Sequence, residues 1–267
     1  MASEDNSSMA VLTSEAVVLR TWPVHEADLI VSFFTRDYGR MRGVAKAALK
    51  SRKRFGGALE PMTLARAWFA ERPRQELVRL DQLEIVRSPL SAAVDHTRMT
   101  VLSFYAEVLD EALPERDPQD AVFRLLVSVL EQTAAVQPET GESQATQPWM
   151  ALTYFSLWMT RLMGLLPDTS RCMVCGEALA LRPEEVSFSN YADGLFCGLH
   201  ANGSASGLSA DSWQLAQRML RAPASSFAAE PWPRKRGQEL RRFTLQTLER
   251  HLERKLKSAE ALARLGG

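Results

Sequence analysis

The sequence predicts an α+β multidomain protein in which a small β-barrel is followed by a helical domain with a short ribbon inserted into it. Apolar residues alternate with a period close to two over residues 15–86, and from residue 88 onward they recur with the helical period of about 3.6. All three cysteines fall in one pattern, a Cys-x-x-Cys pair and, 21 residues later, a Cys-x-x-His pair. The change of period predicts the two domains, and the cysteine pattern predicts the ribbon.

The first domain is predicted from five short apolar or alternating segments, most of which are separated by turn residues such as Gly39 and Pro61. We expect strands at residues 16–20, 29–34, 40–45, 62–69 and 76–86. Five strands of this size are typical of the oligonucleotide-binding (OB) barrel. The sequence therefore predicts a five-stranded OB-fold domain over residues 14–87, preceded by a flexible tail at residues 1–13.

The second domain is predicted to be helical and to be made of two parts, residues 88–170 and residues 202–267. We expect helices that begin at Ser88-Pro89 and at Asp117-Pro118, where a polar residue precedes a proline. An apolar helix over residues 148–166 and a short helix over residues 209–221 follow. One long helix is expected to end the domain, with an apolar stripe of Leu245, Leu248, Leu252 and Leu256.

The inserted ribbon, residues 171–201, is predicted to hold one structural Zn²⁺ per chain. Zn²⁺ favours four thiolate or imidazole ligands in a closed tetrahedron, and four protein ligands leave no position for a catalytic water. Asp193-Gly194 lies between two apolar segments of the ribbon and indicates a hairpin. The alternative is three buried reduced cysteines and a surface histidine. The predicted ligands are Cys172, Cys175, Cys197 and His200.

The formal net charge of zero conceals a segregation of charge along the chain. Residues 1–88 carry 14 Lys/Arg and 11 Asp/Glu, residues 89–170 carry 4 and 11, and residues 234–267 carry 10 and 4. Two basic regions therefore flank an acidic middle, and such a chain can engage a polyanion without being basic overall. We expect the acidic middle to serve packing or protein contacts rather than DNA.

The strongest candidate for nucleic-acid binding is the segment over residues 36–54, where eight basic residues face a single acid, Asp37. Cations that follow phosphates and an aromatic ring that stacks on a base are the components of sequence-tolerant single-strand binding. The alternative is a solvated run of charge. We expect a mobile loop in which Phe55 stacks on a base. The predicted DNA-binding residues are Arg40, Arg42, Lys46, Lys50, Arg52, Lys53, Arg54 and Phe55.

Sequence patterns for catalysis are absent. The chain has no G-x₄-G-K-[ST] phosphate loop, and His25-Glu26 lacks the second histidine of an H-E-x-x-H zinc site. We therefore expect no enzymatic activity and no small-molecule substrate. No run of 18 apolar residues is present, and the first residues are acidic and polar rather than those of a signal peptide. These features predict a cytoplasmic protein with no membrane partner, and DNA binding by residues 36–54 would make it nucleoid-associated.

Three stretches resemble the bacterial DNA repair and recombination mediator family RecO: residues 38–61, residues 162–176 and residues 251–258, in the order and spacing of that family. The first stretch departs from the family at Ala47, where glycine is usual, and at Leu49-Lys50 in place of arginine. His200 stands where some relatives have cysteine. Together the three stretches extend the resemblance over residues 15–258.

The resemblance implies a non-enzymatic mediator of the RecF pathway type. Such a protein binds single- and double-stranded DNA, anneals complementary strands and, with RecR, helps to load RecA on DNA coated by single-strand-binding protein. The resemblance also points to the acidic C-terminal tail of single-strand-binding protein as a partner, for which Arg241, Arg242 and Arg250 are the candidate contacts. The alternatives are a zinc-ribbon RNA-binding or transcription accessory factor and a zinc-dependent hydrolase.

Overall fold

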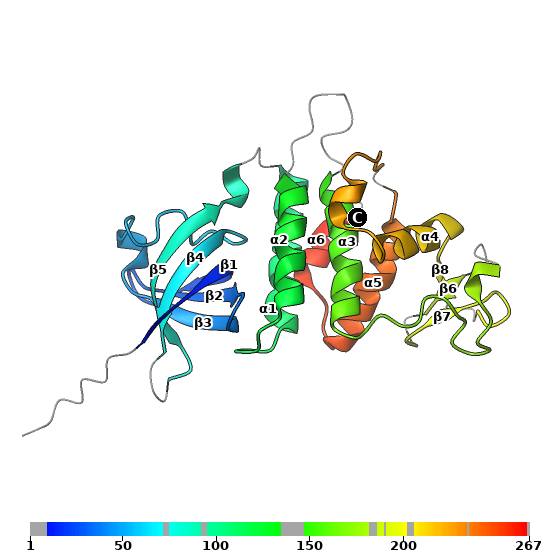
Figure 1. Cartoon of the computed structure of the whole chain (residues 1–267), viewed down its shortest axis with the longest axis horizontal. Helices are drawn as coiled ribbons and strands as arrows, with labels where there is room; N and C mark the ends of the chain where they lie inside the picture. Colours follow the sequence, from blue (N-terminus) through cyan, green and yellow to red (C-terminus); the bar gives the residue numbers. More distant parts are fainter. Residues whose placement is uncertain are drawn as a thin grey trace, which may run out of the picture. The chain divides into compact units, whose positions relative to one another are not determined.

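The computed structural model describes residues 10–71, 75–91, 95–134, 147–181, 186–189, 191–201, 206–233 and 235–265. The chain divides into two compact units (Figure 1). The first comprises Met1–Ser91 and Ala106–Phe123, and the second comprises Ala92–Tyr105 and Arg124–Gly267. Residues 106–123, which the sequence assigned to the helical domain, thus group with the barrel.

Five strands form the first unit, as predicted. They are β1 (Val11–Pro23), β2 (Leu29–Thr35), β3 (Gly39–Ala45), β4 (Leu64–Ala70) and β5 (Val78–Arg87). Their order is β1-β2-β3-β5-β4, and β1 also pairs with β4, so the sheet closes into a barrel. Closure between β3 and β5 is slight, because only two residue pairs join them, in parallel. Since β1 begins at Val11, residues 11–13 belong to the sheet and not to a tail.

The barrel core contains alternate strand residues, as the two-residue period of a strand requires. Val31 and Phe33 of β2 and Met41 of β3 are among them. The connection between β3 and β4 also contributes Ala48, which begins a short 3-10 turn, and Phe55. This connection therefore fills one end of the barrel instead of extending into solvent.

The helical part begins with α1 (His96–Ala112) and α2 (Asp120–Ala134), which contribute residues to both units. The predicted start of the first helix at Ser88 is wrong. Residues 89–91 form a 3-10 turn, and α1 is capped instead by Asp95, whose side chain accepts the backbone N–H of Arg98 at 2.8 Å.

In the second unit α3 (Gln147–Leu162) packs on α5 (Gln238–His251), and α4 (Ala210–Met219) also contacts α5. The predicted long terminal helix is broken, because α6 (Lys257–Arg264) is a separate helix. The break occurs where Glu253 takes a left-handed conformation, φ 53°. The Glu249 carboxylate accepts the backbone N–H of Leu256 across it at 3.0 Å.

A small sheet of three two-residue strands lies in the second unit, with the order β7-β6-β8. The strands are β6 (Ser187–Phe188), β7 (Leu195–Phe196) and β8 (Ser206–Gly207). The predicted hairpin is confirmed, since β6 and β7 pair in antiparallel fashion on either side of Asp193-Gly194. The Phe188 ring lies 5.2 Å from that of Phe243 and attaches the sheet to α5. Within the described ranges, no helix combines the length and apolar character that crossing a membrane requires.

Ala47 occupies a strained position between β3 and the 3-10 turn. Its φ of 52° and ψ of 32° are left-handed, a conformation that costs an L-residue about 1–2 kcal/mol. The position is held because the Asp28 carboxylate accepts the Ala47 N–H at 2.7 Å. A glycine at this position would remove this strain.

We predict that Ala47→Gly raises the free energy of unfolding by about 0.5–1 kcal/mol. Glycine relieves the left-handed strain but loses about 0.5–1 kcal/mol through the greater entropy of the unfolded chain. Urea denaturation of the whole protein measures the change. The matched control is Ala48→Gly, which removes a buried methyl group from the adjacent turn and should lower stability. A loss of stability in Ala47→Gly would contradict the proposed strain.

Candidate metal centre and candidate nucleic-acid interface

The four predicted metal ligands converge at one point of the ribbon. The ligand atoms of Cys172, Cys175, Cys197 and His200 all lie within 4.8 Å of one another. Sγ of Cys175 lies 3.9 Å from Sγ of Cys197, and Nδ1 of His200 lies 3.8 Å from Sγ of Cys172. A tetrahedron with metal–sulfur bonds of about 2.3 Å has edges of about 3.8 Å. The cluster therefore has the size and the donors of a four-coordinate metal site.

Two tight turns position the ligands. In the first turn the N–H of Gly176 donates to the carbonyl oxygen of Cys172 at 2.9 Å, and Gly176 has a φ of 73° that favours glycine. In the second turn the N–H of His200 donates to the carbonyl oxygen of Cys197 at 2.9 Å. The spacing of the Cys-x-x-Cys and Cys-x-x-His pairs thus fits these two hydrogen-bonded turns.

The thiol of Cys172 has an environment that favours its ionised form. Burial acts against the thiolate, but the backbone N–H groups of Cys175, Cys197 and Val174 outweigh it and lower the pKa of Cys172 to about 6. A thiolate is the form that binds a metal ion. The backbone of the two turns is therefore suited to a cation at this point.

The basic segment between β3 and β4 is joined to itself and to β5 by backbone hydrogen bonds. We call residues 46–57 the basic loop. The N–H of Phe55 donates to Ser51 O at 3.2 Å, and the N–H of Leu83 on β5 donates to Arg54 O at 2.9 Å. Lys46, Lys50, Arg52 and Lys53 are exposed on it. The loop thus presents four cations from a fixed framework.

Two residues of the basic loop support it instead of pointing toward solvent. Phe55 is only 1 % exposed and lies in the barrel core, so it cannot stack on a base as predicted. Burial in the end of the barrel removes the large apolar surface of the ring from water, which favours this position over an exposed one. Arg54 is half-buried, donates to Lys46 O at 2.5 Å and lies 5.0 Å from the Phe55 ring centroid.

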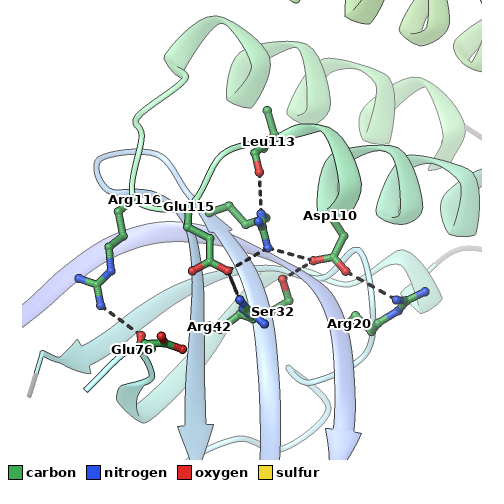
Figure 2. Close-up of polar contacts among 9 residues, drawn as sticks. Arg20, Ser32, Arg42, Glu76, Asp110, Leu113, Glu115 and Arg116 are labelled. Atoms are coloured by element: carbon green, nitrogen blue, oxygen red, sulfur yellow. Dashed lines mark hydrogen bonds and ion pairs between the residues drawn. The ribbon is translucent and has the colours of Figure 1, made fainter. Parts of the chain in front are cut away.

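The two predicted arginines of β3 are engaged within the first unit (Figure 2). Arg42 pairs with Glu115 at 2.5 Å, and Arg40 lies 3.5 Å from the same carboxylate and 3.7 Å from that of Asp110. Sequence reasoning missed both acidic partners, which lie about 70 residues away along the chain. The acidic composition of residues 89–170 was the available signal.

The three arginines predicted to bind a partner differ in their surroundings. Arg241 is 6 % exposed, burial lowers its pKa to about 10, and it donates to Thr153 Oγ1 at 2.9 Å. Arg241 is nevertheless among the residues that line the groove described next, so its role as a partner contact stays a prediction. Arg250 pairs with Asp193, whereas Arg242 is exposed.

Arg242 borders a groove that sequence reasoning did not identify. The groove has a volume of about 480 Å³ and lies among α3, α5 and α6. Leu152, Leu245 and Leu262 give it apolar walls, and Arg242 supplies a cation. Glu239 also lines it, and its carboxylate accepts hydrogen bonds from Ser209.

Two family models match the chain, one for each part. Residues 9–89 match the model described as "Recombination protein O N terminal", and residues 93–260 match "Recombination protein O C terminal". The barrel and the helical part together thus define the chain as a protein of DNA recombination and repair.

Curated relatives agree with these matches over nearly the full chain. The chain is 49% identical to the DNA repair protein RecO of Koribacter versatilis over 94% of its own length and 98% of the relative's. It is 32% identical to the DNA repair protein RecO of Anaeromyxobacter dehalogenans strain 2CP-C, over 94% and 95% of the two chains. The chain belongs to the RecO family of DNA repair proteins.

Proposed function

We propose that this protein is a non-catalytic recombination mediator that binds single- and double-stranded DNA and anneals complementary strands. In this proposal it acts with RecR to load RecA on DNA coated by single-strand-binding protein. The observation that carries the proposal is the basic loop, four exposed cations on a framework anchored in a five-stranded barrel. Membership of the RecO family supports the same role.

The fold of the barrel supports the proposed DNA binding in addition to the charge of the basic loop. Its strand order and its parallel β3–β5 contact correspond to a barrel of OB type, which commonly binds oligonucleotides. An ordered loop loses less conformational entropy on binding than a mobile one. Because Phe55 is buried, contacts from this loop are to phosphates, and such contacts do not depend on base sequence.

We predict that Lys50, Arg52 and Lys53 together determine the salt dependence of single-strand binding. With about four phosphate contacts, those of these three residues and of Lys46, the log–log slope should be near −2.8, taking about −0.7 per contact. Replacing the three exposed residues by alanine should make the slope shallower by about 2. Fluorescence anisotropy of an oligothymidylate between low and moderate salt measures it.

Arg54 is excluded from that triple variant because it braces the loop through Lys46 O and the Phe55 ring. A matched control replaces three exposed cations of the helical part, Arg242, Lys255 and Arg264, and so removes the same charge. The control should retain most of the slope. If the loop variant kept the wild-type slope and annealing rate, the basic loop would be a solvated run of charge and not a DNA contact.

We further propose that the cysteine–histidine cluster binds one structural Zn²⁺. Three thiolates and one imidazole form a donor set that suits Zn²⁺, and all four positions of a tetrahedron would be occupied by protein. The ion would join the turn before β6 to the turn after β7, and so would hold the ribbon together. A closed ligand set favours a structural role and not a catalytic one.

Metal analysis of the purified protein should find about one zinc per chain. Structural zinc in such knuckles binds with roughly 10–16 kcal/mol, so loss of one ligand should unfold the ribbon locally. Cys175→Ser should therefore lose the metal and lower the melting temperature. Val174→Ser is the control, because Val174 is exposed between the ligands and supplies none. Metal-free protein with unchanged melting would refute the proposal.

The groove beside Arg242 is our proposed site for the acidic tail of single-strand-binding protein. Apolar walls with a cation at the edge fit an acidic peptide that also presents apolar side chains. Arg242 supplies the exposed cation of this groove, which the largely buried Arg241 also lines, whereas Arg250 lies outside it and is paired with Asp193. The proposed groove thus offers the peptide both a cation for its carboxylates and apolar walls for its apolar side chains.

Arg242→Glu should weaken binding of a fluorescent acidic, apolar-ended peptide about tenfold or more, because the charge at the edge of the groove is reversed. Lys255→Glu makes the same change in net charge outside the groove and should have a small effect. Peptide titration measures both variants. Equal losses in the two would mean that general charge attraction, and not the groove, binds the peptide.

A further inference from the structure

The outer face of β2 and β3 is the part of an OB-type barrel that ordinarily receives an oligonucleotide. Strand residues alternate between the two faces, so Ser32 and Phe34 point outward while Val31 and Phe33 fill the core. Both outward residues are nevertheless 0% exposed. The part of this face around Ser32 and Phe34 is therefore covered, whereas Arg42 on β3 stays exposed.

The cover is the segment Ala106–Phe123, which groups with the barrel. The Phe34 ring lies 5.5 Å from the ring of Phe123, and Ser32 Oγ donates to Asp110 Oδ1 at 2.6 Å. On the same segment Val108 and Leu109 are fully buried. The contact thus combines an aromatic pair with a part-buried hydrogen bond.

Two carboxylates of this segment, Asp110 and Glu115, meet the arginines of the strands, and we call this group the acidic clamp (Figure 2). Asp110 accepts from Ser32 and lies 3.7 Å from the guanidinium of Arg20. Glu115 accepts from Arg42 Nε at 2.6 Å. Carboxylate oxygens thus occupy the places beside these arginines that the phosphate oxygens of a bound strand would need.

Arg40 is the most restricted of the three arginines. Its Nε donates to the carbonyl oxygen of Leu113 at 2.9 Å, just beyond the last residue of α1, where helix carbonyls lack intrahelical partners. The backbone N–H of Arg116 donates to Arg40 O at 2.9 Å and adds a short parallel bridge to β3. Arg40 is therefore bound through both its side chain and its backbone.

Gly39 shows how closely the segment approaches β3. A Cβ at this position would lie 2.3 Å from the carbonyl oxygen of Asp117, and the residue has a φ of 72°. Only glycine is compatible with this contact and this conformation. The segment is therefore fitted to the beginning of β3, in the part of the strand that β5 does not pair with.

We propose that the segment Ala106–Phe123 is a built-in occupant of the barrel's oligonucleotide face. DNA then binds at the end of the barrel that carries the basic loop and does not cross β2 and β3. Arg40 and Arg42 hold the segment and make no phosphate contacts. The sequence had predicted that both bind DNA. The inference rests on the proposed DNA binding and specifies where on the barrel it occurs.

The decisive variants are Arg42→Gln, which removes the ion pair with Glu115, and Glu115→Gln, which also removes the contact of Glu115 with Arg40. Both side chains are at least partly exposed, so the fold should stay intact. Oligothymidylate binding by each is measured against salt. Both should keep the wild-type log–log slope. A slope that is shallower by about 0.7 in Arg42→Gln would identify Arg42 as a phosphate contact and overturn the inference. Tighter binding with a steeper slope in Glu115→Gln would overturn it too, because the carboxylate would then be competing with DNA.

A second measurement uses wild-type protein and amide hydrogen exchange with and without oligothymidylate. Protection should increase in residues 46–57 and stay unchanged in residues 29–35 and 106–123. Faster exchange in residues 106–123 on DNA binding would show that the segment is displaced, which contradicts a permanent cover.

The loop triple variant separates the two proposals. If the loop triple variant keeps the wild-type salt slope, the proposal that the basic loop binds DNA is wrong. If instead the loop variant loses slope as predicted and Arg42→Gln loses slope too, loop binding stands and only the inference about the covered face is wrong.

Discussion

The hydrogen bond from Ser32 to Asp110 connects a fully buried strand residue to the segment that covers the barrel. A buried hydroxyl without a partner is costly, so Asp110 has to lie at this point. Its carboxylate then attracts Arg20 and Arg40, and Arg40 reaches the end of α1. The position of the segment Ala106–Phe123 against the barrel, and the charge that remains on the outer face, both depend on this contact.

A buried residue also determines the arrangement of the basic loop. Phe55 fills the core, and the residues around it are thereby turned outward in a fixed arrangement. A ring that was expected to bind a base instead determines where the cations lie. The barrel therefore has one covered face and one basic end, and the two features separate the arginines that pair with Asp110 and Glu115 from the cations of the basic loop.

Features that depend on local sequence could be predicted. The five strands and the β6–β7 hairpin follow from alternation and turn residues, and the convergence of three cysteines and His200 follows from their spacing. Features that depend on distant partners could not be predicted. Nothing near Arg42 in the sequence indicates Glu115, and nothing near Arg241 indicates that Thr153 accepts its hydrogen bond inside the helical unit.

The remaining errors also have physical causes. A stripe of leucines predicts a helix but does not show where it stops, and Glu249 ends α5 by accepting the N–H of Leu256. A Ser-Pro pair predicts a helix start, but Asp95 provides the better cap seven residues later. In both places a side chain competes for backbone hydrogen bonds, and only the folded structure shows which one succeeds.

The central claim is that DNA meets this barrel at its basic end and not across its covered face. Photo-cross-linking with an oligothymidylate that carries photoreactive bases, followed by peptide mapping, tests it most directly. The account predicts cross-links to peptides that contain residues 46–60. Cross-links concentrated in residues 29–42, on β2 and the beginning of β3, would contradict it.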